Sequence, residues 1–124
     1  VELKSLDLLS ENEGNSTWEF QSESPSKGRI LAFRAKGTFS GNHWHKGNSA
    51  AKNPEELLLI SGSVLIEWSD VPEKDYHQQL QAEAPCIIKI FPMVKHRLKA
   101  LEDICFLEAN SIEEHKADTY YPQK

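Results

Sequence analysis

The sequence has little cysteine, and this scarcity narrows the kinds of site the protein can hold. The 124 residues include only two cysteines, Cys86 and Cys105, and they do not form the Cys-x-x-Cys spacing of thiolate zinc sites. Each lies in an apolar run, APCIIKIF or DICFLEA, so free buried thiols are the default expectation. A disulfide between neighbouring strands is the alternative. Free thiols favour a cytoplasmic location.

Long hydrophobic runs and excess positive charge are also missing. The longest apolar stretch, Leu57 to Ile60, is far too short to cross a bilayer. The acidic N-terminal sequence VELKSLDLLSENEG does not have the basic-then-apolar order of a signal peptide. The formal net charge is -5, whereas nucleic acids and anionic membranes select basic faces. Neither is therefore expected as a partner.

What the sequence does have is many short strand-like segments separated by Gly and Pro. The length suits one domain, residues 1–124. The spacing predicts an all-β sandwich or small barrel with its core at about residues 28–109. Strands are expected at 29–36, 43–46, 55–60, 64–68, 76–81, 86–91, 94–98 and 104–108. Residues 37–42 (GTFSGN) are expected to form a loop.

Helix is expected in only one place, the segment Ser111 to Ala117, where Ser111 and Glu114 match a capping box. Trp18 and Phe20 alternate with polar residues, which favours a half-buried strand. The segment Glu55 to Ile60 is apolar on both faces. Another segment of this chain or a second subunit must cover its outer face, and we favour a homodimer.

Three histidines and a glutamate form the main candidate site. His43 and His45 are two residues apart, so on a strand both imidazoles point to the same face. Glu55 begins the next strand and His96 begins a later one. Three neutral imidazoles and one carboxylate suit Zn²⁺ best, with Fe²⁺, Mn²⁺ or Ni²⁺ as alternatives. Glu56 competes with Glu55 as the carboxylate ligand.

The spacing of these residues resembles the first cupin motif, G(x)5HxH…E(x)6G, with Gly37 and Gly62 at its ends. The second motif, PxGxxH, is matched by Pro92 and His96, with Met93 following the proline. The resemblance implies a double-stranded β-helix, the cupin jelly-roll barrel, with a short C-terminal helix or tail. It also implies one divalent metal ion at the centre of the barrel. Nine residues separate His45 from Glu55, so a loop insertion is expected there.

Three phrases, SGNHWHKG, EELLLISGSVLIEW and LEANSIEEHKADTYYP, are similar to a narrower group. This group is the C-terminal cupin domain of capsular-polysaccharide enzymes that act on UDP-linked sugars, along with nucleotide-sugar ketoisomerases. The resemblance implies isomerisation or epimerisation next to a ketone on a nucleotide sugar. A metal-bound histidine is not free to act as the base, which leaves His77 and the tyrosines Tyr76, Tyr120 and Tyr121. Of these, His77 and Tyr76 are the preferred catalytic candidates. His115 is expected at the surface. The residues expected to contact the sugar nucleotide are Trp44, Lys46, Phe91, Lys95 and Tyr120.

Two other functions fit the same residues. A non-catalytic cupin could grip a sugar through its metal, and a small-cupin oxygenase could use iron at the same ligands. Metal identity separates the oxygenase from the isomerase. Proton exchange at carbon separates the isomerase from the binding protein.

Overall fold

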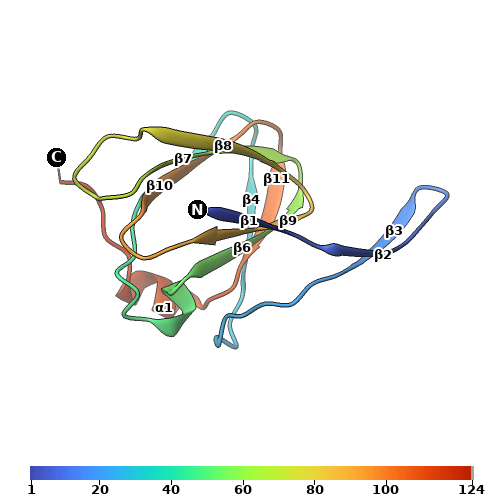
Figure 1. Cartoon of the computed structure of the whole chain (residues 1–124), viewed down its shortest axis with the longest axis horizontal. Helices are drawn as coiled ribbons and strands as arrows, with labels where there is room; N and C mark the ends of the chain where they lie inside the picture. The colour runs from blue at the N-terminus through green and yellow to red at the C-terminus, as the bar shows by residue number, and fades with distance from the viewer. Residues whose placement is uncertain (124) are drawn as a thin grey trace.

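Two antiparallel β-sheets packed face to face make up most of the chain in the computed structural model, which describes residues 1–123 (Figure 1). One sheet has five strands, in the order β1 (Glu2–Ser5), β9 (Cys86–Ile90), β6 (Glu55–Ser61), β11 (Ile104–Glu108) and β4 (Ile30–Arg34). The other has four, in the order β5 (Phe39–His43), β10 (Lys95–Ala100), β7 (Ser63–Ser69) and β8 (Gln78–Glu83). The predicted all-β jelly roll is confirmed.

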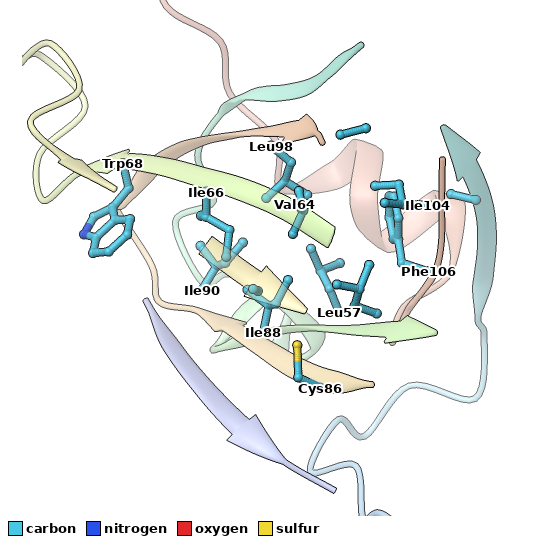
Figure 2. Close-up of a cluster of buried hydrophobic side chains, with 14 of the residues drawn as sticks. Leu57, Val64, Ile66, Trp68, Cys86, Ile88, Ile90, Leu98, Ile104 and Phe106 are labelled. Carbon is cyan, nitrogen blue, oxygen red and sulfur yellow. The ribbon is translucent and has the colours of Figure 1, made fainter. Parts of the chain in front are cut away.

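The core lies between the two sheets and is filled by alternate residues of their strands (Figure 2). On β6, Leu57 and Leu59 point inward and are at most 3% exposed, whereas Ile60 is 43% exposed. This alternation is what period-two strands impose. Cys86 is buried in the core and Cys105 is half-buried, and both are free thiols, as expected.

The N-terminal segment covers part of the outer face of β6. Phe20 and Ser22 line a small groove together with Leu58 and Ile87 of the five-stranded sheet. The carboxylate of Glu56 fixes this segment, because its Oε1 accepts hydrogen bonds from Ser22 Oγ at 3.2 Å and from the Glu23 amide at 2.8 Å. A segment of this chain therefore supplies part of the cover that the apolar second face required.

A hairpin of β2 (Asp7–Asn12) and β3 (Asn15–Glu19) projects from the barrel, as the blue ribbon shows (Figure 1). All of its residues are exposed. Trp18 is 37% exposed and Phe20, just beyond the hairpin, is 46% exposed, so the prediction of a half-buried strand here was wrong. The reason is tertiary: β2 and β3 pair only with each other, and Trp18 borders an open groove with Leu58 and Ile60 of β6.

Two local predictions also need correction, and Met93 adopts an unusual backbone conformation. The predicted loop at 37–42 contains most of β5, because pairing with β10 supplies backbone partners to a Gly-containing segment. β8 begins at Gln78, so Tyr76 and His77 precede the strand. Met93 adopts a φ of 66°, so the turn before His96 reaches the left-handed region without glycine.

The one α-helix among residues 1–123, α1 (Ile112–Ala117), has the predicted capping box of Ser111 and Glu114. A 3-10 turn, η1 (Ala50–Lys52), forms inside the insertion between His45 and Glu55. Both lie at the same end of the barrel (Figure 1). No helix in the described part of the chain is long and apolar enough to cross a membrane.

Candidate active site

Three imidazoles meet inside the barrel near the end where α1 and η1 lie. His43 ends β5 and pairs directly with His96 on β10, and His45 follows two residues later. One ring nitrogen of each histidine lies within 4.8 Å of those of the other two. All three side chains are buried, with exposed fractions of 1 to 9%. Gly41 allows this approach, because a Cβ there would lie 3.0 Å from the His96 carbonyl oxygen.

Backbone carbonyls fix the tautomer of two of these histidines. His45 Nδ1 lies 2.7 Å from the Asp118 carbonyl oxygen, and His96 Nδ1 lies 2.9 Å from the Val94 carbonyl oxygen. A carbonyl only accepts, so each Nδ1 carries the proton and each neutral ring has its lone pair on Nε2. Both Nε2 atoms face Glu55, at 3.0 Å from Oε2 for His45 and 3.6 Å from Oε1 for His96.

Burial lowers the pKa of two of the three imidazoles and keeps them neutral. It lowers the pKa of His43 to about 2, with the neighbouring His96 adding to the shift. It also lowers the pKa of His96 to about 4, against the opposing charge of Glu55. Burial alone would raise the pKa of Glu55, but its contact with His45 and then the charge of Lys52 hold it well below its usual value. At neutral pH the centre therefore holds the Glu55 carboxylate beside the neutral rings of His43 and His96.

A second group of side chains faces the three histidines. Glu55, Glu108 and His115 also bring ligand atoms within 4.8 Å of one another. Lys52, which is fully buried, reaches this group with its ammonium, which contacts Glu55 Oε2 and lies 3.0 Å from His115 Nδ1. Burial and then the charge of Lys52 lower the pKa of His115 to about 4. Burial and then the charge of Glu55 raise the pKa of Glu108.

The two groups border a cavity of about 290 Å³ that opens between the barrel and the C-terminal segment. Arg34, Phe39 and Tyr121 lie at its lining together with His43, Glu55, His96, Glu108 and His115. Tyr121 is 61% exposed and its ring packs edge-on against His43 at 5.7 Å. A small polar molecule entering this cavity would therefore meet imidazole, carboxylate and guanidinium groups together.

Solved structures with this arrangement of sheets include several proteins of sugar metabolism. A double mutant of QdtA, a 3,4-ketoisomerase from Thermoanaerobacterium thermosaccharolyticum in complex with TDP, superposes with a TM-score of 0.70 at 18% identity, over 98% of this chain and 86% of that one. The Mycobacterium tuberculosis rmlC epimerase gives 0.62 at 13%, over 86% and 60%. The capsular polysaccharide assembling protein CapF from Staphylococcus aureus gives 0.60 at 17%, over 97% of this chain but 35% of its own.

The fold is that of a cupin. The chain spans about a third of the length of CapF, so the likeness there concerns one part of a longer protein. No protein-family model matches the chain, and no curated protein matches it in sequence.

The donor set of this cupin barrel fits a divalent metal ion. His45 Nε2 is buried and has no hydrogen-bond donor facing it, yet it lies 3.0 Å from a carboxylate oxygen. Two electron-pair donors at this distance would be stabilised by a cation between them, and a divalent metal ion would fit these ligand types. The Nδ1 hydrogen bonds to backbone carbonyls are the usual outer contacts of metal-bound histidines. Glu56, by contrast, points to the opposite face and is bound to Ser22 and Glu23.

The predicted catalytic pair lies outside this cavity. The side chain of His77 is 46% exposed and its ring lies near Asp70 and the Asp75 carbonyl. The Tyr76 hydroxyl donates to Asn42 Oδ1, and the Lys95 ammonium lies over its ring at 4.9 Å. Neither residue is among those that line the cavity of the cupin barrel.

The five residues predicted to contact the sugar nucleotide also lie elsewhere. Trp44, Lys95 and Tyr120 line a second groove on the barrel, which shares Tyr121 with the cavity. Lys46 sits over the Tyr120 ring at 4.3 Å, and Phe91 packs against the hydrophobic core. A role for them in binding stays a prediction.

Sequence reasoning missed the second group, Lys52, Glu108 and His115. His115 was expected at the surface, but its side chain is 18% exposed and lines the cavity. The available signal was weak: Lys52 lies in the insertion that separates His45 from Glu55, and His115 lies on the one expected helix. Where that helix docks decides its role, and the sequence carries no pattern for this.

Proposed function

We propose that the protein is an isomerase or epimerase that moves a proton next to a ketone on a nucleotide-activated sugar. The observation that carries this proposal is the cavity, in which neutral imidazoles, a carboxylate and Glu108 border one space of about 290 Å³. The activities of the neighbours with this fold, 3,4-ketoisomerase and epimerase, support the same class of reaction.

We further propose that His43, His45, Glu55 and His96 hold one divalent metal ion, with zinc as the expected metal. When bound, such an ion polarises a carbonyl oxygen as a Lewis acid and so favours loss of the proton on the neighbouring carbon. The chain's own contribution is a set of lone pairs held in place before the ion arrives. Backbone carbonyls orient His45 and His96, and β5–β10 pairing places His43 beside them.

Proton transfer requires a group that is not a metal ligand. Glu108 is the carboxylate that lines the cavity outside the proposed ligand set, and burial raises its pKa, which suits a base that takes up and returns a proton. Arg34 also lines the cavity and is exposed, so its guanidinium is the cation placed to meet the phosphates of a nucleotide.

Deuterium exchange tests this function. The metal-loaded protein is incubated in D₂O with a panel of nucleotide-linked keto-sugars, and incorporation at the carbon beside the ketone is followed by NMR. We expect exchange with at least one sugar and a loss of about 100-fold or more in the Glu108→Gln variant, while Lys116→Gln on the exposed face of α1 exchanges normally. No exchange with any sugar, or bound iron accompanied by oxygen consumption, contradicts the proposal.

The exposed hairpin supports the further proposal of a homodimer. Leu8 and Leu9 are 46% and 58% exposed on β2, and an isolated two-stranded hairpin is only marginally stable in water. A second copy of the chain packing on these side chains would bury them. Sedimentation equilibrium of the full chain tests this: a dimer that dissociates on Leu9→Glu substitution is expected, and a monomer at micromolar concentration contradicts the proposal.

A further inference from the structure

Lys52 is a fully buried cation inside the candidate active site. Its Nζ contacts Glu55 Oε2 and lies 3.0 Å from His115 Nδ1, and its side chain is 0% exposed. The turn η1 delivers it there: Ser49 Oγ accepts the Ala51 amide at the start of this turn, and Lys52 is its last residue. Burying an ammonium without hydrogen-bond partners would cost free energy, so the contacts with Glu55 and His115 fix the position of the Lys52 Nζ.

The contact with Lys52 fixes the tautomer of His115. An ammonium only donates, so His115 Nδ1 must accept and must carry the lone pair. The neutral ring then bears its proton on Nε2. Glu108 Oε2 lies 3.8 Å from Nδ1, which is too far for a competing hydrogen bond. No described residue hydrogen-bonds Nε2, so this N–H remains available to a molecule in the cavity that the ring lines.

His115 is thereby opposite in tautomer to His45 and His96. Those rings donate from Nδ1 to carbonyl oxygens and present lone pairs at Nε2. The His115 ring lies 5.4 Å from His43 and 5.8 Å from His45, so one cavity holds both kinds of imidazole side by side. The partner of Nδ1, a carbonyl in one case and an ammonium in the other, decides which kind each ring is.

We propose that His115 is a catalytic residue that donates its Nε2 hydrogen to the oxygen of the bound ketone, and that Lys52 is a positioning residue that fixes His115 in the donating form. This inference rests on the proposed function for the identity of the oxygen. The hydrogen bond strengthens as negative charge accumulates on that oxygen during enolate formation, which is where a preorganised donor accelerates a reaction. No proton leaves His115 in this step.

The first test does not depend on the substrate. Long-range ¹H–¹⁵N spectra of the metal-free full chain with ¹⁵N-labelled histidine report which nitrogen of each ring is protonated. We expect Nε2–H for His115 and Nδ1–H for His45 and His96. In Lys52→Met the His115 Nδ1 signal should move toward that of an unbonded nitrogen, whereas Lys116→Gln leaves it in place. Protonation of His115 at Nδ1 in the wild type, or no movement in a folded Lys52→Met protein, overturns the assignment.

The second test uses deuterium exchange with a nucleotide keto-sugar. We expect His115→Phe to lower kcat by about 100-fold with little change in KM, and His115→Gln, which retains an N–H donor, to recover at least about 10-fold of it. Metal content should equal that of the wild type in both variants, because His115 lies outside the proposed ligand set.

The two failures are distinguishable. If the wild type exchanges with no sugar, the proposed function fails and the nitrogen spectra still decide the assignment of Lys52 and His115. If the wild type exchanges and His115→Phe keeps its kcat, the inference fails while the proposed function stands.

Discussion

Asp118 is the residue whose removal should show most clearly how the C-terminal segment supports the histidine-bearing loop. Its carboxylate is 1% exposed and accepts hydrogen bonds from two backbone amides, Lys46 N at 2.9 Å and Ser49 N at 3.0 Å. Hydrogen bonds to a charged group contribute about 1.5 to 3 kcal/mol each. Water entering the vacated space offsets part of this loss, so Asp118→Ala should lower the free energy of unfolding by about 3 kcal/mol. For a domain of this size that corresponds to a Tm about 12 °C lower.

Guanidinium unfolding followed by tryptophan fluorescence measures this change, and the midpoint should fall without a change in the slope m. Amide hydrogen exchange adds a local readout, because the Lys46 and Ser49 amides should lose protection. Asp103→Ala is the matched control: its carboxylate also accepts a backbone amide, Lys36 N at 2.8 Å, but at the surface. We expect Asp103→Ala to lower the free energy of unfolding by less than about 1 kcal/mol. An Asp118→Ala protein within about 0.5 kcal/mol of the wild type would refute the reasoning.

Three further predictions concern the metal, pH and backbone. His43→Ala should abolish stoichiometric metal measured by elemental analysis, and full occupancy in this variant would contradict the ligand set. In the chelator-treated protein, burial lowers the pKa of His96 in the folded state to about 4, whereas in the unfolded state His96 takes up a proton below about pH 6.5. The free energy of unfolding should therefore fall as the pH is lowered from 6.5 toward 4. The expected loss in the free energy of unfolding is roughly 3 kcal/mol, measured by chemical unfolding at several pH values. If the free energy of unfolding of His96→Gln depends on pH as steeply as that of the wild type, the prediction is contradicted. Gly62→Ala should cost about 2 kcal/mol or more, because φ is +85° and the new Cβ would meet the Asp103 carbonyl oxygen at 2.4 Å. Gly14→Ala, at φ +82° in open space, should lower the free energy of unfolding by only about 1 kcal/mol. Equal losses in the two variants, measured by differential scanning calorimetry, would contradict a steric contribution at Gly62.

Part of the convergence of the four predicted ligands could be predicted from the sequence, because alternation along β6 turns Glu55 inward and Glu56 outward. The strand predicted at 43–46 is wrong beyond His43, since β5 ends there, and the Asp118 carbonyl rather than strand alternation orients His45. The capping box at Ser111 was equally local, since it needs only residues three apart. Rules of this kind act within a few residues, and the structure agrees with them.

The sequence-based predictions that were wrong concern residues whose positions depend on contacts between distant segments. The loop predicted at 37–42 becomes strand β5 only because β10 offers it hydrogen-bond partners. Lys52 lies in an insertion without hydrophobic periodicity, and its burial follows from meeting Glu55 and His115. His115 would be at the surface if α1 docked elsewhere. Positions of this kind require knowledge of the assembled barrel.

The segment that follows β11 contributes no strand to either sheet, yet it completes the candidate site. A protein ending at Ala109 would keep every strand of both sheets, yet it would lack the carbonyl that orients His45, the imidazole beside Lys52 and the Trp44–Tyr120 bridge. The strands carry His43, Glu55, His96 and Glu108, whereas the segment after β11 supplies the contacts that orient His45 and the ring of His115. Directed evolution confined to residues 110–123 could therefore retune selectivity while leaving the strands of the barrel unchanged.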